Sequence, residues 1–186
     1  MIINLGAGKK LLPEAINVDV MDYPGVDIIA DLSIFPWPWP DECVNGVCAS
    51  HILEHFQDQK QFIEECLRIL KPGGFLRIVA PHSSCVTNTG CLGHYRTYSY
   101  STFHDYLSKP FYMFKTARFK TVEQKLNWWY EAIDEEKNMP KWMAGIIAMV
   151  NPVMNTLIKI ITPRVFENVF CPAIQVREIV WEGRKL

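Results

Sequence analysis

The sequence of 186 residues lacks several features that would assign a protein to a class at once. Its formal net charge of −1 leaves no excess of positive charge, and no long run of Lys or Arg could track phosphates, so we expect no nucleic-acid partner. Its six cysteines include no C-x-x-C pair, which favours reduced thiols in a cytoplasmic protein over a disulfide framework. Because no charged leader precedes an apolar stretch, we expect no signal peptide.

Short apolar runs alternate with turns over the first 81 residues. Strands are expected at residues 2–5, 16–20, 26–30, 44–49 and 75–80. From Asp58, apolar residues recur at three-and-four spacing, which predicts an amphipathic helix that stops at Lys71-Pro72-Gly73-Gly74. Only one or two helical turns fit between the first two strands, over residues 9–15. This alternation predicts a mostly parallel α/β sheet with helices on both faces.

The second half of the chain is less regular. We expect a polar loop over residues 83–96, a helix over 99–107, strand-rich segments over 111–119 and 121–129, and a last strand over 174–181. Between Trp142 and Ile161 the residues are mainly apolar, but Asn151-Pro152, Asn155 and Lys159 interrupt them, which argues against a membrane-spanning helix. We expect a helical pair over the substrate or a homodimer surface there, and peripheral contact with a membrane stays open.

A tryptophan-proline segment follows the third expected strand, with Trp37 and Trp39 alternating with prolines. Proline has no backbone N–H, so this segment cannot form a regular helix. We expect a rigid apolar plug at the edge of the sheet. Stacking of a tryptophan on a bound ring is the alternative.

A glycine-rich turn, Leu5-Gly6-Ala7-Gly8, follows the first expected strand, and the next two strands end near Asp19 and Asp31. Ligands of open α/β sheets bind outside the carboxyl ends of the strands, so these carboxylates should face one crevice. Glycine lets the backbone approach a ligand closely, and a carboxylate can accept two hydrogen bonds from a vicinal diol. The pattern therefore indicates a nucleoside-binding edge.

Two other nucleotide-binding motifs fit this turn poorly. The dinucleotide fingerprint G-x-G-x-x-G needs a third glycine where this chain has Leu11, and its acid lies about 20 residues further on, whereas Asp19 comes sooner. The phosphate-binding pattern G-x-x-x-x-G-K-[ST] is absent from the sequence.

Taken in order, the motifs of residues 1–81 resemble the class I S-adenosylmethionine-dependent methyltransferases, and most closely the small methyltransferase type 11 group. The set consists of the glycine turn, Asp19, Ala30-Asp31-Leu32, Ser50-His51-Ile52-Leu53-Glu54-His55-Phe56 and Arg68-Ile69-Leu70-Lys71-Pro72-Gly73-Gly74. The resemblance implies a Rossmann-like fold with a mostly parallel seven-stranded sheet. Family members often have helices before the first strand, and this chain is expected to depart from them in lacking these helices and in carrying a helical insertion at about residues 138–170. We expect one domain over residues 1–186, with a cofactor-binding half (1–81) and a substrate half (82–186).

The resemblance also implies S-adenosylmethionine as the cofactor. In this family the glycine turn approaches its methionine part, the acid after the second strand binds the ribose, and the acid after the third meets the adenine. The implied cofactor-binding residues are Gly6, Ala7, Gly8, Asp19, Val20, Asp31, Leu32, Ser50 and His51. Many members carry an acid before the turn, where this chain has Asn4, so Asn4 or backbone carbonyls are expected to meet the cofactor's amino group.

The loop after residue 81 lies where the family places its substrate. A neutral imidazole is a suitable proton acceptor for a hydroxyl near pH 7, so His94 and His82 are the expected catalytic residues. Tyr95 and Arg96 are expected to bind substrate, and Arg96 could hold a carboxylate or phosphate. We expect O-methylation of a small molecule or glycan. The alternative is a catalytically silent methyltransferase-like module that binds a partner or a membrane surface.

Two histidine patterns raise a metal alternative. His51, Glu54 and His55 match the H-x-x-E-H pattern of one class of zinc peptidases. A second pattern, H-x2-C-x5-C-x2-H, is formed by His82, Cys85, Cys91 and His94. Because the first follows directly on a strand and the second lacks a C-x-x-C pair, we expect no metal at either. His51 is expected to line the cofactor crevice with Ser50, and Glu54 and His55 to start a helix or bond to the backbone. From the second pattern we expect His82 or His94 to contact the substrate.

Overall fold

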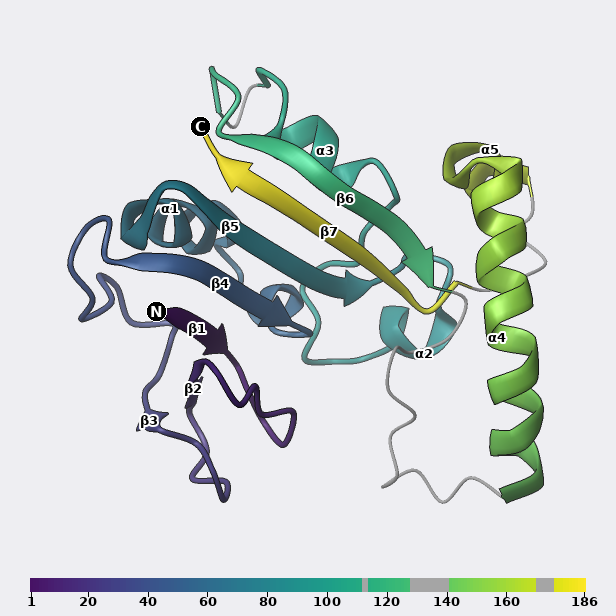
Figure 1. The fold of residues 1–186 in the computed structure, drawn as a ribbon, viewed down its shortest axis with the longest axis horizontal. Helices are drawn as coiled ribbons and strands as arrows, with labels where there is room; N and C mark the ends of the chain where they lie inside the picture. Colours follow the sequence, from purple (N-terminus) through teal and green to yellow (C-terminus); the bar gives the residue numbers. More distant parts are fainter. Residues whose placement is uncertain (112–113, 128–140, 170–175) are drawn as a thin grey trace.

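The computed structural model describes residues 1–111, 114–127, 141–169 and 176–186, without the side chains of 86–87, 141–148, 151, 164 and 168–169 (Figure 1). Its sheet has seven strands in the order β3-β2-β1-β4-β5-β7-β6. The strands are β1 (Ile2–Leu5), β2 (Ile16–Asp19), β3 (Ile28–Ile29), β4 (Val44–Ser50), β5 (Leu70–Pro81), β6 (Phe119–Asn127) and β7 (Glu178–Lys185). The first five pair in parallel, and β7 runs antiparallel to both β5 and β6. The predicted mostly parallel sheet is confirmed.

The strand order reverses at β1. From β1 the chain steps outward to β2 and β3, and it then returns to place β4 on the other side of β1. The apolar side chains of Ile3, Leu5 and Val47 are fully buried, as expected for central parallel strands. A reversal of this kind opens a crevice beyond the carboxyl ends of the strands on either side of it.

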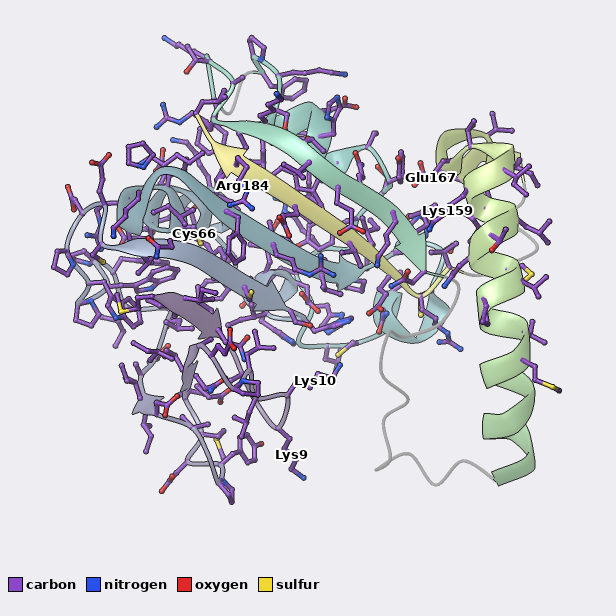
Figure 2. The ribbon with its side chains drawn as sticks, in the orientation of Figure 1. Lys9, Lys10, Cys66, Lys159, Glu167 and Arg184 are labelled. Atoms are coloured by element: carbon purple, nitrogen blue, oxygen red, sulfur yellow. The ribbon has the colours of Figure 1, made fainter. Side chains whose placement is uncertain are left out.

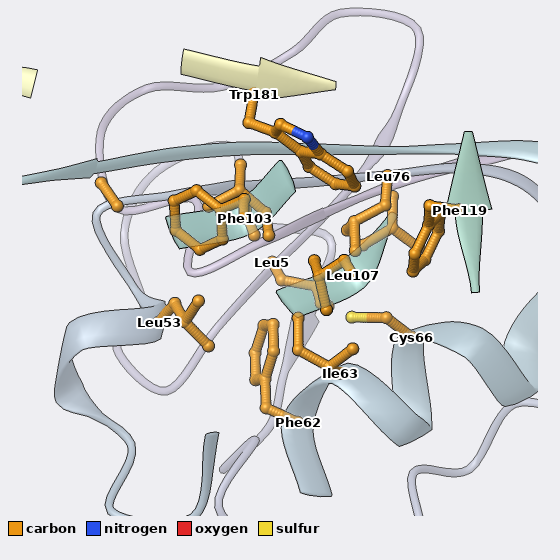
Figure 3. Packing of buried hydrophobic residues seen from close by; sticks show 14 of the residues in the cluster. Leu5, Leu53, Phe62, Ile63, Cys66, Leu76, Phe103, Leu107, Phe119 and Trp181 are labelled. Atoms are coloured by element: carbon orange, nitrogen blue, oxygen red, sulfur yellow. The ribbon is translucent and has the colours of Figure 1, made fainter. Parts of the chain in front are cut away.

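The described helices are η1 (Leu53–His55, 3₁₀), α1 (Gln59–Ile69), α2 (Val86–Thr89), α3 (Thr102–Leu107), α4 (Lys141–Ile161) and α5 (Pro163–Val169). The helix expected from Asp58 is confirmed as α1. It starts there because the Asp58 carboxylate caps it by accepting from the Gln61 amide at 2.9 Å. Figure 3 shows Phe62 and Cys66 of α1 on the same side of the sheet as Phe103 of α3, below Trp181. All four are buried.

The other face of the central sheet is polar. Arg77 on β5 forms ion pairs with Glu123 on β6 at 3.1 Å and with Glu182 on β7 at 3.7 Å. These side chains are 20–44% exposed. In the described part of the chain the two faces are therefore covered unequally, and α1 and α3 bury the apolar one.

The connection between β1 and β2 differs from the prediction, because turns replace the expected helical turns. The Asn17 side chain accepts from the Leu12 amide at 2.8 Å and donates to the Leu12 carbonyl at 3.2 Å. The Asn4 amide donates to the Lys10 carbonyl at 3.0 Å. These side chains bind the backbone groups that a helix would pair internally. Figure 2 shows Lys9 and Lys10 on this loop.

Other boundaries differ as well. The third strand has two residues instead of the expected five. The helix α1 ends at Ile69, and the Lys71-Pro72-Gly73-Gly74 segment lies inside β5. The last strand begins at Glu178 and runs on to Lys185, and residues 114–118 form no strand. The expected residues 112–113, 128–129 and 174–175 lie outside the described part.

The apolar segment that contains Trp142 and Ile161 forms one continuous helix, α4, instead of a pair of helices. A second helix, α5, follows it and pairs with it. The expected helical insertion before the last strand is confirmed, whereas its role over the substrate or at a homodimer surface stays a prediction. Figure 1 places this pair beside the end of the sheet where β6 ends. Glu167 attaches α5 by accepting from His82 Nε2 at 2.9 Å and from the Tyr100 amide at 2.6 Å. Figure 2 shows Glu167 on the side of α5 that faces the sheet. Of the helices described, none has the length and hydropathy needed to cross a membrane.

The tryptophan-proline segment forms the expected apolar plug. Trp37 and Trp39 are 3% and 9% exposed, and the Trp37 ring meets Phe62 edge-on. Arg68 on α1 donates to the carbonyls of Trp37 and Trp39 at 3.0 and 2.7 Å. Glu65 accepts from the Trp37 amide at 2.9 Å and from Arg68 at 2.8 Å. The segment is therefore fastened to α1 by charge-assisted hydrogen bonds.

Glu65→Gln should lower the free energy of unfolding at pH 7 by about 1–3 kcal/mol, the usual cost of losing hydrogen bonds to a charged group. Hydrogen bonds from Arg68 hold the pKa of Glu65 below its ordinary value, so its contribution is complete above about pH 4.5 and is lost as the pH falls through the folded-state pKa. Urea denaturation should show the gap between parent and variant shrinking as the pH falls below about 4.5.

Glu64→Gln is the matched control for this experiment. Glu64 is the neighbouring residue on α1 and forms an exposed ion pair with Lys60, so its replacement should change stability little at any pH. A loss for Glu65→Gln that is independent of pH would contradict the assignment.

Candidate functional site

An open cleft of about 620 Å³ lies beyond the carboxyl ends of β1, β2 and β4, where the strand order reverses. Of the predicted site residues, seven line it: Gly6, Asp19, Val20, Asp31, Leu32, His51 and Tyr95. They come from five segments of the chain, at or after the ends of β1, β2, β3, β4 and β5. The double pairing of β1 therefore brings the predicted cofactor residues together.

The glycine turn after β1 has left-handed backbone geometry at Gly6 (φ 63°) and Gly8 (φ 51°). A Cβ atom on Gly6 would collide with the side chain of Ile52, whereas at Gly8 it would meet nothing within 4 Å. Gly6 is thus required both by its φ angle and by packing. The space above Gly8 leaves its backbone open to a ligand.

Asp19, at the end of β2, is 9% exposed and holds the glycine turn in place. Its Oδ2 accepts from the Gly8 amide at 2.8 Å, and its Oδ1 accepts from the Met21 amide at 2.9 Å. A carboxylate offers about four acceptor positions, so two remain for a ligand in the cleft.

Asp31 follows β3 and is exposed at the rim of the cleft. The hydroxyl and the backbone amide of Ser33 donate to its Oδ1 at 2.6 and 2.9 Å and lower the pKa of the carboxyl. Asp31 is therefore ionised at neutral pH. Leu32, beside it, is buried and gives the cleft an apolar wall.

His51, directly after β4, has a φ angle of 52°, which is uncommon for a residue with a side chain and is concentrated at functional sites. Its Nε2 lies 2.9 Å from Glu178 Oε2, and its Nδ1 lies 3.3 Å from Glu54 Oε1. Burial alone would lower the pKa of His51, but the two carboxylates outweigh it and raise this pKa to about 9. The ring is therefore cationic at neutral pH.

The residues predicted to act on the substrate do not all line the cleft. Tyr95 lines the cleft, and its amide donates to the Glu54 carbonyl at 2.8 Å. The His94 ring lies beside the His55 ring, with centroids 4.8 Å apart, and His55 also lines the cleft. Arg96 lies at a neighbouring cavity of about 320 Å³ that Tyr98 also lines.

His82 lies away from the cleft. It is 1% exposed, its Nδ1 accepts from the Ser84 amide at 3.1 Å, and its Nε2 donates to Glu167. Because both ring nitrogens are engaged with other parts of the fold, the geometry assigns His82 to the attachment of α5. We therefore withdraw it as a candidate base.

Three other predicted cofactor contacts, Ala7, Gly8 and Ser50, border the cleft residues in the sequence but are not in the lining. Asn4 is also absent from it. This residue is 4% exposed, and its amide donates to Asn17 Oδ1 at 3.0 Å as well as to the Lys10 carbonyl. Asn4 therefore stabilises the loop between β1 and β2.

Some lining residues were not predicted. Phe35, Ile52, Phe56 and Gln61 contribute to the cleft, and so does His55. Three of them, Ile52, His55 and Phe56, lie in the Ser50 to Phe56 motif, and Phe35 precedes the tryptophan-proline segment, so the positions of these four in the sequence carried a signal. Only the fold shows that they face the same space as the glycine turn.

In the described residues, neither of the two histidine patterns that raised a metal alternative forms a metal site from its own members as they are spaced in the sequence. His51 pairs with two carboxylates, and the Nδ1 of His55 bonds to the Gly93 carbonyl at 2.8 Å. Within the second pattern, His82 bonds to Glu167 and Cys85 accepts from Arg177 at 3.2 Å.

Comparison with known proteins gives the site its context. A family model described as a methyltransferase domain matches residues 6–78, which include the glycine turn, both carboxylates and His51. This match supports the resemblance of residues 6–78 to the class I S-adenosylmethionine-dependent methyltransferases. A probable S-adenosylmethionine-dependent methyltransferase of Mycolicibacterium smegmatis is 41% identical over 64 residues. That match covers 32% of this chain and 23% of the relative, so the chain spans less than a quarter of the relative's length.

Solved methyltransferase structures share the fold of this chain. An S-adenosylmethionine-dependent methyltransferase from Archaeoglobus fulgidus superposes with a TM-score of 0.59 at 16% identity and covers 99% of this chain and 85% of its own. The 1,6-didemethyltoxoflavin-N1-methyltransferase of Burkholderia thailandensis, solved with S-adenosylhomocysteine, gives 0.53 at 13% identity and covers 99% and 70%. The Rossmann-like methyltransferase fold therefore includes the second half of the chain, which the family model does not match.

S-adenosylmethionine is the cofactor of these methyltransferases, and the cleft fits it. The open space above Gly8 allows a ligand to approach the backbone. Asp19 keeps acceptor positions for hydroxyl groups, and Asp31 keeps its charge for an amino group. S-adenosylmethionine has no phosphate group, so the cleft needs no phosphate-binding residues.

Gly6→Ala should destabilise the fold more than Gly8→Ala. Both alanines carry the left-handed penalty of about 1–2 kcal/mol, and only Gly6→Ala adds a collision with Ile52, for a total of roughly 2–5 kcal/mol. Chemical denaturation of the two variants measures the difference. Equal losses would show that Ile52 does not enforce the turn.

Proposed function

We propose that this chain transfers the methyl group of S-adenosylmethionine to a hydroxyl oxygen of a small molecule or glycan. The observation that carries the proposal is the shared cleft. Gly6, Asp19 and Asp31 line it together with His55 and Tyr95, so cofactor groups and proton-accepting groups border the same space. The match of residues 6–78 to a methyltransferase-domain model supports the reaction class.

On the cofactor side, we assign the glycine turn to the methionine part. Asp19 and Val20 would hold the ribose, Asp31 and Leu32 the adenine, and His51 with Ser50 the region between cofactor and acceptor. When bound, S-adenosylmethionine supplies a sulfonium whose methyl group is open to nucleophilic attack. The protein's own contribution is to hold the acceptor in line with this group, and such positioning can account for several kcal/mol of rate enhancement.

On the acceptor side, Phe35 and Phe56 give the cleft aromatic walls, and Tyr95 adds a phenol. The imidazoles of His55 and His94 are the proton acceptors closest to this part of the cleft, and a hydroxyl acceptor needs one. Arg96, at the adjoining cavity, could bind a carboxylate or phosphate on the same acceptor. This arrangement favours a polar acceptor with an aromatic or sugar ring.

Isothermal titration with S-adenosylmethionine and S-adenosylhomocysteine should show binding of both, and none of NAD. Asp19→Ala should weaken this binding by about 10- to 100-fold, because hydroxyl donors lose a charged partner worth about 1–3 kcal/mol. Asp22→Ala is the control, since Asp22 is exposed on the loop after β2 and does not line the cleft. An unchanged dissociation constant for Asp19→Ala would refute the ribose assignment.

The second candidate function is a methyltransferase-like module without activity that binds a membrane surface. Met149, Val153 and Ile160 of α4 are 72%, 58% and 71% exposed and lie at helical spacing on one stripe. Flotation with vesicles tests the contact, and gel filtration tests the alternative of a homodimer through this stripe.

Single-turnover assays with labelled S-adenosylmethionine and a set of phenol, sugar and carboxylate acceptors separate the two functions. We expect label transfer to at least one hydroxyl acceptor, and His94→Gln should slow transfer while cofactor affinity stays within about twofold, since His94 does not line the cofactor side. Cofactor binding without transfer to any acceptor would favour the silent module.

A further inference from the structure

Three potential metal ligands meet at the acceptor side of the cleft. Glu54 and His55 belong to η1, and His94 belongs to the loop after α2. One ligand atom from each lies within 4.8 Å of the other two, and in the described part of the chain this is the one such group of histidine, cysteine and carboxylate side chains. It combines two of the three residues of the first histidine pattern with one of the four residues of the second.

The imidazoles of this group are oriented as metal ligands usually are. His55 Nδ1 lies 2.8 Å from the Gly93 carbonyl, and His94 Nδ1 lies 3.1 Å from the Asn88 carbonyl. A carbonyl only accepts, so each Nδ1 carries the hydrogen and each Nε2 keeps a free lone pair. Histidines that bind a metal commonly donate their other ring N–H to a carbonyl in this way.

The carboxylate of Glu54 points to the same conclusion independently. Glu54 is 0% exposed, and neither of its oxygens accepts a hydrogen bond. His51 approaches Oε1 at 3.3 Å as an ion pair but is shared with Glu178. Burying a charge without hydrogen bonds is costly, so this carboxylate is suited to binding a cation.

The two segments that carry the ligands are tied together by their backbone. The Tyr95 amide donates to the Glu54 carbonyl at 2.8 Å, directly beside His94, and the His94 amide donates to the Cys91 carbonyl at 3.1 Å. A zinc ion with bonds of about 2.0–2.2 Å holds its ligand atoms roughly 3.5 Å apart. Because His55 is exposed and His94 is half-exposed, small rotations of their rings would close this distance.

We propose that Glu54, His55 and His94 bind a divalent transition metal, with zinc as the best fit. Two imidazoles and one carboxylate are a donor set of catalytic zinc sites, which keep a further position open. Magnesium and calcium prefer oxygen ligands throughout, so they fit poorly. His55 lines the cleft, and an open position there would face an acceptor.

The site deepens the proposed function and rests on it in one respect. A hydroxyl bound to the ion would lose its proton more readily, as water does on zinc, and would then attack the methyl group as an alkoxide or phenoxide. The proton would pass to solvent or to a nearby base. As the new carbon–oxygen bond forms, the bond between the methyl carbon and the sulfonium sulfur would break, and S-adenosylhomocysteine would leave with that electron pair. His94 would then act as a ligand and not as the base.

The test uses the full chain without a histidine tag, so that bound metal reports the protein's own side chains. Elemental analysis after dialysis should find about one zinc per chain. Titration with zinc against a chromophoric chelator should show Glu54→Gln and His94→Gln binding at least about 100-fold more weakly, in line with the loss of a ligand or its support. Thermal unfolding in the presence of chelator checks that both variants fold.

Two matched variants serve as controls. Cys91→Ser changes an exposed thiol in the same loop. His104→Gln changes a histidine of α3 that bonds to Thr121 at 3.0 Å and does not belong to the group of three ligands. Both should keep the zinc of the parent. Loss of zinc in Cys91→Ser would overturn the proposed ligand set.

Absence of zinc from the purified protein, together with no binding in the titration, would overturn the proposal. Zinc binding that is as tight in Glu54→Gln and His94→Gln as in the two control variants would also overturn it. Another transition metal at the same three residues would uphold the ligand set and overturn the choice of zinc. Binding of S-adenosylmethionine is measured separately in chelator, so failure of the metal site is distinguishable from failure of the methyltransferase function.

Discussion

β1 pairs with β2 on one side and with β4 on the other, and the position of every cleft residue depends on this double pairing. The register aligns Leu5 with Val18 and with Ala49, so the glycine turn, Asp19 and His51 follow their strands at the same edge. Slipping any strand by one residue would turn its buried side chains to the other face. The fully buried Ile3, Leu5 and Val47 resist that slip.

The second half of the chain contributes to the cleft through buried charge. Glu178, the first residue of β7, bonds to His51, and the Asn127 amide at the end of β6 donates to Glu178 at 3.1 Å. His51 also pairs with Glu54 of η1. The cationic ring therefore connects the two antiparallel strands to the cofactor edge, and its left-handed backbone is held from both sides.

The elements that the sequence predicted well have a local signal. The period of apolar residues after Asp58 specifies α1, and the cap at Asp58 specifies its start. The helix expected between β1 and β2 was wrong because Asn4 and Asn17 bind backbone groups across the loop, and such pairings cannot be read from periodicity. The start of β7 was misplaced for a similar reason, since pairing with both β5 and β6 decides its length.

The candidate site divides in the same way. The sequence by itself determined the methyltransferase resemblance and the cofactor edge, because a glycine turn and acids at strand ends act through the local backbone geometry that they share. Only the tertiary structure decided which imidazoles face a ligand. It buried His82 against Glu167 and brought His94 beside His55 and Glu54, because side chains about 40 residues apart meet only when the loop after β5 folds back over η1.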